Sequence, residues 1–345
     1  MSGAVLGVDI GNDSLKLALC KDRSIRKTAV ARMPAGLLRN GRVESVPYVS
    51  DLIRTTMREN HIHASRAAVV LPPETVCLRT LVMPRMSAEQ LAYNLPYEFS
   101  DYLTEDLKHY VFDYAMITDF TKAASVSPVP EMLSGGQESV PGMELMAAAV
   151  SRSVLEEFQA ILRGAGTRLV KAAPGICGYM TLIRMAENMR GGGAAREYCI
   201  LDMGFRSIRM HIFYGDRHLL TRSLDTGLSV LDGVIAGMYQ TDTHLAHTYL
   251  LTNHENCQQS EPFRNTCRQM AAEVARSLDF YRSSTPDNQL GDVWLSGGGA
   301  VIQPLRLAIA ETLEMKIHGA DELVQGGEKI DDCYECLQAI ALSMD

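Results

Sequence analysis

The chain has 345 residues and a mass of 38.0 kDa, which is more than one simple core needs and suits a protein of two lobes. Hydrophobic residues make up 46% and charged residues 21%, a balance that indicates a globular protein. The formal net charge of −8 and the isoelectric point near 5.6 argue against nucleic acid as the main partner, because phosphate binding requires a basic face.

The first residues carry neither the basic nor the apolar segment of a secretion signal, since residues 1–9 read M-S-G-A-V-L-G-V-D. No run of apolar residues approaches the ~18 that a membrane-spanning helix needs. We therefore expect a cytoplasmic protein without direct membrane insertion, which reaches a membrane only through a partner.

The first predicted element is a β-hairpin at residues 9–19, which read D-I-G-N-D-S-L-K-L-A-L. Apolar residues precede the turn and then alternate at Leu15, Leu17 and Leu19, the period of a strand with one buried face. A tight turn of this kind directs backbone N–H groups at one point, which suits an anion. An aspartate at the strand end can hold a hydrated Mg²⁺. The turn therefore predicts a phosphate site, with Asp9 also a metal ligand, made of Asp9, Gly11, Asn12, Ser14 and Lys16.

A helix start follows at Ser87, because Gln90 lies three residues on, the spacing of a capping box. Leu91 and Leu95 continue at helical spacing. The segment from there to Asp106 is acidic and aromatic. Two interpretations stay open for it: a solvated helix whose aromatic side chains pack inward, or a surface for a partner.

The second informative element repeats the first. Residues 202–212 read D-M-G-F-R-S-I-R-M-H-I, and Asp202, Gly204, Ser207 and Arg209 take the places of Asp9, Gly11, Ser14 and Lys16 at a constant offset. One such turn alone would be an ordinary hairpin, but two in register favour two turns that clamp the phosphates of one nucleotide. The predicted second half of the site is Asp202, Gly204 and Ser207, with Asp202 as a metal ligand.

A third element lies at residues 292–300, which read D-V-W-L-S-G-G-G-A. A short apolar strand is followed by glycines and then by a helical stretch from Pro304 to Leu313. Strand, glycines and helix in this order let a backbone pass under a flat purine. We therefore expect Gly297, Gly298 and Gly299 to lie under the adenine of a bound ATP.

These three motifs, in this order, resemble the phosphate-1, phosphate-2 and adenosine motifs of the actin, Hsp70 and sugar-kinase superfamily. Within it, the chain resembles the PilM family of type IV pilus assembly proteins along nearly its whole length. FtsA and the cytoplasmic part of secretion platform proteins share the fold. The stretches that carry the resemblance are 34–43 (P-A-G-L-L-R-N-G-R-V), 69–73 (V-V-L-P-P) with 81–87 (L-V-M-P-R-M-S), and 276–281 (R-S-L-D-F-Y).

The resemblance implies an α/β protein with the actin-like two-lobed fold, that is, duplicated ribonuclease-H-like domains with a small subdomain inserted in the first lobe. The first lobe is expected at residues 1–195 and the second at 196–345, with the inserted subdomain at about 75–148. Within the insertion, residues 121–142 are rich in Ser, Pro and Gly and predict a mobile loop.

Three departures from the family pattern affect the function expected. Asp13 stands in the first turn, where a carboxylate would repel a triphosphate. The second turn carries the bulky pair Phe205 and Arg206, of which Arg206 could supply a cation to the phosphates. Residues 171–178 (K-A-A-P-G-I-C-G) contain no acid, so no general base for an attacking water is visible there.

The resemblance therefore implies a cytoplasmic scaffold that uses bound Mg-ATP to set its shape and is at most a weak ATPase, with no catalytic residue assigned. Its partner would be the short cytoplasmic N-terminal tail of a PilN-like bitopic membrane protein. Other pilus platform proteins and further copies of the chain, arranged as a ring, are additional expected partners.

Two alternatives stay open. A small-molecule kinase of the same fold would need a polar substrate pocket and a catalytic aspartate in the first lobe. A membrane-associated filament protein like FtsA would need a basic amphipathic anchor at the C-terminus. Residues 331–345 lack the Lys- and Arg-rich face of such an anchor, and they predict a packed terminal helix.

Overall fold

The computed structural model describes residues 3–119, 142–191 and 195–344. Its centre consists of two five-stranded sheets. The first has the order β10-β6-β1-β2-β3 and contains β1 (Val5–Ile10), β2 (Ser14–Lys21), β3 (Ser24–Arg32), β6 (Arg66–Leu71) and β10 (Arg168–Pro174). β1, β2 and β3 form an antiparallel meander, and β6 and β10 continue the sheet in parallel from β1.

The second sheet repeats this plan with the order β13-β12-β11-β14-β15. Its strands are β11 (Glu197–Met203), β12 (Ile208–Tyr214), β13 (Arg217–Leu224), β14 (Asp292–Ser296) and β15 (Lys316–Gly319). Here β11, β12 and β13 form the meander, and β14 and β15 are the parallel strands. The two sheets thus share strand order and direction, and the duplicated two-lobed fold that the resemblance implies is confirmed.

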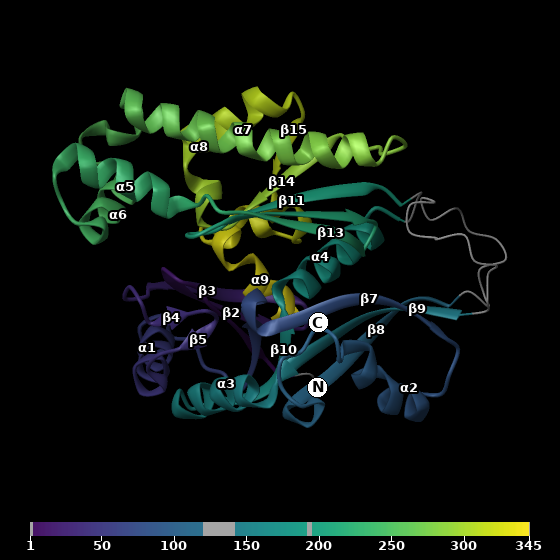
Figure 1. Cartoon of the computed structure of the whole chain (residues 1–345). Helices are drawn as coiled ribbons and strands as arrows, with labels where there is room; N and C mark the ends of the chain where they lie inside the picture. Colours follow the sequence, from purple (N-terminus) through teal and green to yellow (C-terminus); the bar gives the residue numbers. More distant parts are fainter. Residues whose placement is uncertain (1–2, 120–141, 192–194, 345) are drawn as a thin grey trace.

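Helices cover the outer face of each sheet and also fill the space between the sheets (Figure 1). α1 (Val46–Glu59) and α3 (Arg152–Gly164) pack on the outer face of the first sheet. The outer face of the second sheet is covered by α7 (Glu261–Ser284) and α8 (Gln303–Leu313). The pair α5 (Leu228–Tyr239) and α6 (Thr243–Thr252) lies at one end of this sheet (Figure 1) and extends the same core. Between the sheets lie α4 (Gly175–Met189) and α9 (Cys333–Met344).

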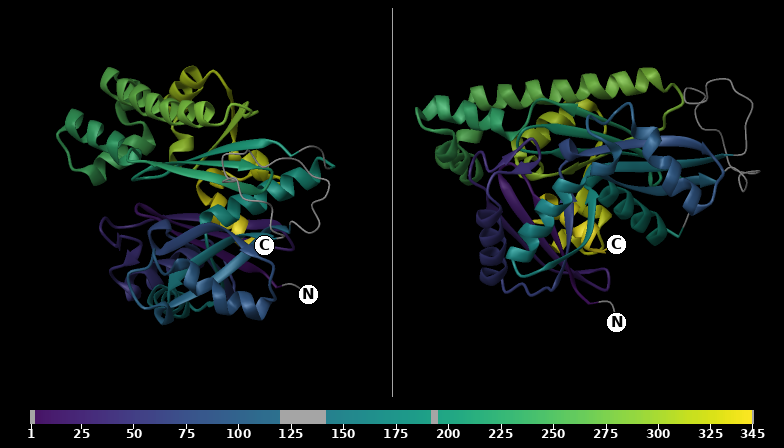
Figure 2. Two further views of the ribbon diagram at one scale, coloured as in Figure 1. Left: turned by 45° about the vertical axis from the view of Figure 1, so that its right-hand side comes forward. Right: turned by 60° about the horizontal axis from the view of Figure 1, so that its bottom comes forward.

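The terminal helix α9 crosses from the second half of the chain to the first sheet, where it packs on β1, β2 and β6. The approach is close, because a Cβ atom at Gly7 would lie 1.9 Å from the carbonyl oxygen of Ala339. Both views in Figure 2 show the C-terminus beside the first lobe. The helix is buried along its length, as expected of a packed terminal helix, and it ties the two lobes together.

A separate sheet forms the inserted subdomain, called the insertion below. Its order is β7-β9-β8, with β7 (Val76–Pro84), β8 (Tyr110–Asp119) and β9 (Gly142–Ser151). The helix α2 (Ala88–Asn94) begins with the predicted capping box, in which Ser87 and Gln90 exchange side-chain and backbone hydrogen bonds. Apart from Gly142, the first residue of β9, the predicted loop at 121–142 lies outside the described residues.

The remaining strands, β4 (Leu38–Arg39) and β5 (Arg42–Val43), pair with each other in a two-stranded ribbon beside the first lobe. Among the described residues, no helix is long and apolar enough to cross a membrane.

Candidate functional site

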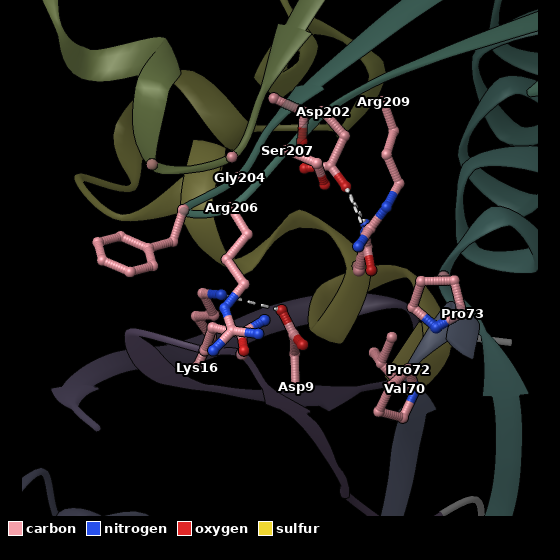
Figure 3. A pocket seen from close by; sticks show the side chains of 18 of the residues that line it. Asp9, Lys16, Val70, Pro72, Pro73, Asp202, Gly204, Arg206, Ser207 and Arg209 are labelled. Carbon is pink, nitrogen blue, oxygen red and sulfur yellow. Dashed lines mark hydrogen bonds and ion pairs between the residues drawn. The ribbon is translucent and has the colours of Figure 1, made fainter. Parts of the chain in front are cut away.

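A cavity of about 640 Å³ lies between the two sheets and is called the central cavity below. Strand periodicity explains which side chains reach it. In β2, Leu15 and Leu17 pack outward into the first core, so Lys16 between them faces inward. In β12, Ile208 and Met210 pack outward in the same way, and Arg209 faces inward. Figure 3 shows the side chains from the two lobes facing each other.

The two hairpin turns that enclose this cavity have the same construction. The N–H group of Gly11 donates to the carbonyl oxygen of Ser14 over 2.9 Å, and the N–H group of Gly204 donates to that of Ser207 over 3.0 Å. The same hydrogen bond therefore closes both turns. All four residues line the central cavity, so the two turns present their backbone to one space from opposite lobes.

Each hairpin also carries a cross-strand ion pair in the same register. Asp9 lies opposite Lys16, with 3.3 Å between Oδ2 and Nζ, and Asp202 lies opposite Arg209, with 3.7 Å between Oδ2 and Nη1 (Figure 3). Burial alone would lower the pKa of Lys16, but the neighbouring carboxylates, above all Asp9, raise it. Burial raises the pKa of Asp202, while Arg209 and Lys16 act in the opposite direction.

The glycine motif after β14 reaches the same cavity, but its three glycines have different environments. Gly297 adopts a φ of +84°, and a Cβ atom there would lie 2.7 Å from the carbonyl oxygen of Met203. Gly298 lines the cavity beside Leu228. Gly299 is buried and packs against the Met203 side chain, and it is absent from the cavity wall.

The structure therefore brings together ten of the eleven residues that the sequence predicts for the site, and the exception is Gly299. The residues that line the cavity are Asp9, Gly11, Asn12, Ser14, Lys16, Asp202, Gly204, Ser207, Gly297 and Gly298.

Asp13 does not place an uncompensated charge at the phosphate turn, because two cationic side chains lie beside it. Its carboxylate lies 3.2 Å from Nε2 of His247 in α6 and 3.4 Å from the Arg32 guanidinium. The other ring nitrogen of His247 lies 2.9 Å from the Asp232 carboxylate. Burial alone would lower the pKa of His247, but hydrogen bonds with Asp13 and Asp232 raise it to about 9. Burial acts to raise the pKa of Asp13, but its partners, chiefly His247, lower it.

Arg206 lies at the tip of the second turn and lines the central cavity. Its side chain extends from the second lobe toward Lys16 (Figure 3). The Arg206 guanidinium, the cation expected from the sequence, therefore lies between the lobes, where it could contact the phosphate oxygens of a bound nucleotide.

Sequence reasoning missed the contribution of the terminal helix. Glu335 and Gln338, one turn apart on α9, both line the central cavity. The Gln338 amide donates to the Asp202 carboxylate over 2.9 Å and to the Tyr179 hydroxyl over 3.0 Å. Burial raises the pKa of Glu335, and Lys16 opposes that shift. The signal in the sequence was that Glu335 and Gln338 bring long polar side chains to a mostly apolar terminal helix.

The segment at 171–178 contributes Pro174, Gly175 and Ile176 to the cavity wall, which places no carboxylate there. On α9, Glu335 adds a carboxylate to the cavity. A group able to accept a proton is thus present in the cavity, but it lies on α9 and not in the segment at 171–178.

The donor set suits a hydrated Mg²⁺, since Asp9 and Asp202 extend from opposite walls of the cavity (Figure 3). Mg²⁺ keeps several waters and usually takes one or two carboxylates together with phosphate oxygens. Among the described residues, no group of three or more His, Cys, Asp or Glu side chains could hold an ion by itself.

A second cavity of about 290 Å³, called the insertion cavity below, lies on the insertion. Near it, the exposed rings of Tyr93 and Tyr97 face each other with centroids 5.9 Å apart. Phe99, in contrast, is buried against Phe112 in the core of the insertion. The residues that line the insertion cavity are Ala92, Leu95, Tyr110, Val111, Phe112, Asp113, Tyr114 and Arg152.

A family model described as type IV pilus assembly protein PilM matches residues 7–325. A structure of a PilM–PilN type IV pilus biogenesis complex is similar with a TM-score of 0.77 and 21% identity, covering 98% of this chain and 97% of that chain. The ethanolamine utilization protein EutJ from Carboxydothermus hydrogenoformans is similar with a TM-score of 0.59 and 14% identity, covering 100% and 90%. No curated protein matches the chain by sequence.

Proposed function

The chain belongs to the family of the type IV pilus assembly protein PilM, and from this premise we propose that it is an ATP-binding scaffold of the pilus assembly platform. It would bind the short cytoplasmic N-terminal tail of a PilN-like membrane protein and lie at the inner face of the cytoplasmic membrane through that partner. Other platform proteins and a ring of identical copies would complete the assembly.

One observation carries the nucleotide part of the proposal: two hairpin turns of identical construction face one cavity from the two lobes. Backbone N–H groups of tight turns form anion sites, and Lys16 and Arg206 add cations to the same space. Asp9 and Asp202 would hold Mg²⁺ beside the phosphates, largely through water. When bound, the ion would screen the charge of the phosphates, and Gly297 and Gly298 would lie under the adenine.

The nucleotide would act here as a link between the lobes. A ligand shifts a conformational equilibrium only if it binds one conformation more tightly than the other. A nucleotide that contacts both turns binds best when the turns face each other, so it favours that arrangement of the lobes. Asp13 and His247 already join the lobes beside the turns. Hydrolysis is not required for this role, and we propose that turnover is slow.

The insertion would hold the partner. The insertion cavity lies where α2 and β8 meet Arg152, the first residue of α3, so it opens at the junction of the insertion with the first lobe. Its wall combines the apolar Leu95 and Val111 with the polar Asp113. An extended tail with apolar side chains fits such a groove, and the complex of PilM with PilN supports a PilN-like partner.

The test is a binding measurement with the partner's tail. A fluorescent peptide from the N-terminus of a PilN-like protein encoded beside this chain would be titrated with the protein, and anisotropy would be recorded. A micromolar dissociation constant is expected, because a disordered tail loses entropy when it becomes ordered. A scrambled peptide of the same composition is the control, and equal binding of both peptides would refute the partner assignment.

A further inference from the structure

We propose that two arginines of the β12–β13 hairpin, Arg209 and Arg217, couple the phosphate end of the central cavity to the insertion, so that nucleotide and partner tail strengthen each other's binding. The inference rests on the proposed function, because it concerns how the nucleotide site regulates the partner site.

The hairpin itself is a continuous paired element. Its ladder runs from Ile208 opposite Leu224 to Tyr214 opposite Arg217. Arg209 stands next to the phosphate turn, and Arg217 stands at the far end. Strands rise about 3.3 Å per residue, so the two arginines lie roughly 17 Å apart along one element. A displacement at the phosphate turn is therefore carried to the far end.

At the near end, Arg209 bridges the site and the base of the insertion. Its guanidinium lies 3.7 Å from the Asp202 carboxylate and 3.7 Å from the Glu74 carboxylate. Glu74 belongs to the short turn at Pro73–Thr75, directly before β7, the first strand of the insertion. One side chain thus contacts both the predicted metal ligand and the segment from which the insertion begins.

At the far end, Arg217 pairs with Glu144 on β9, the central strand of the insertion's sheet. The Glu144 side chain is only 6% exposed, and its Oε2 atom has no hydrogen-bond partner among the described residues. A buried carboxylate in this position depends on its cation, because an unpaired buried charge is strongly unfavourable. The insertion is therefore attached to the second lobe at this point.

The sheets of the insertion and the second lobe are separate, so side-chain contacts such as these set their relative position. A nucleotide that contacts both phosphate turns would favour the arrangement in which Arg209 and Arg217 reach their carboxylates. A tail bound to the insertion would favour the same arrangement. Coupling of this kind is reciprocal between two ligands at equilibrium.

The experiment measures the tail peptide's dissociation constant by anisotropy, with and without saturating Mg-ATP, on the full chain. For the wild type we expect binding at least about fivefold tighter with Mg-ATP. The double variant Arg217→Gln with Glu144→Gln replaces the ion pair with a neutral hydrogen-bonding pair and avoids a lone buried charge. For this variant we expect the ratio of the peptide's dissociation constants without and with Mg-ATP to fall to about one. Its ATP affinity, measured by calorimetry, should be unchanged.

Arg222→Gln is the matched control, because Arg222 lies on the same hairpin but its guanidinium covers the exposed ring of Phe280 at 5.2 Å. This variant should keep the wild-type ratio. A wild type that binds both ligands with a ratio of one would overturn the inference alone, as would a double variant that keeps the wild-type ratio. A wild type that does not bind the peptide at all would overturn the proposed function, and the inference with it.

Discussion

The imidazole of His247 in α6 lies 3.2 Å from the carboxylate of Asp13 in the first hairpin turn, and this contact joins the two lobes beside the central cavity. Asp232 holds the other ring nitrogen at 2.9 Å. The imidazole is 3% exposed, so solvent screens the interaction little. The cation thus stands between two carboxylates, one from each lobe.

The first prediction concerns pH. The pKa of His247 is raised to about 9 from 6.5, so its contribution to stability is complete below pH 6.5 and is lost as pH rises through 9. The Asp13 pKa is lowered, so its contribution is present above its ordinary pKa and is lost only in acid. His247→Gln should lower Tm at pH 6 by several degrees, for a loss on the order of 3 kcal/mol. The difference in Tm between this variant and the wild type should shrink as the pH rises toward 9. Calorimetric scans would measure both.

His244→Gln is the control for this experiment, since His244 is exposed on the same helix. It should leave Tm and its pH dependence unchanged. If the Tm of the wild type and that of His247→Gln differ by the same amount at pH 6 and at pH 9, the imidazole acts by packing and not by charge.

The second prediction concerns nucleotide binding. Gly298→Val places a branched side chain into the central cavity, where a Cβ atom would lie 3.3 Å from Leu228 and 3.8 Å from Glu335. We expect Mg-ATP affinity to fall at least about tenfold, which is a loss of roughly 1.4 kcal/mol. Isothermal titration calorimetry would measure it. Gly291→Val, at a position where a Cβ atom meets nothing within 4 Å, should bind like the wild type.

The third prediction concerns hydrolysis. Since no acid lies at the wall formed by residues 174–176, we expect phosphate release close to background, because a positioned base contributes about 10²–10⁴-fold in rate. Any residual turnover should fall in Glu335→Gln, whose side chain keeps its size but cannot accept the proton. A coupled phosphate assay measures this. Turnover of roughly one per second or faster that persists in Glu335→Gln would contradict the expectation.

The fourth prediction locates the partner groove. Ala92 is exposed and lines the insertion cavity, so Ala92→Trp should fill the cavity and weaken tail-peptide binding at least about fivefold. Glu89→Trp, on the same helix but outside the cavity wall, is the matched variant and should bind normally. Anisotropy with the labelled peptide separates them. Equal affinities of the two variants would place the groove elsewhere on the molecule.

Much of the phosphate site could be predicted because its geometry is local. The spacing from Gly11 to Ser14 and from Gly204 to Ser207 determines the hydrogen bond that closes each turn. Alternation in the strand that follows places Lys16 and Arg209 on the inner face. Short-range sterics and hydrogen bonding fix these features, and the repeat itself indicated two equivalent halves.

The sequence by itself therefore determined the duplicated fold, the two turns and the residues that the turns present to one cavity. Only the tertiary structure decided that Gly299 packs on Met203, that Phe99 is buried, and that His247 compensates Asp13. It also decided that Glu335 and Gln338 enter the site. These side chains are distant from their partners in the sequence. They meet because the burial of apolar faces determines which helix packs on which sheet. The position of a charged residue on such a helix follows from that packing.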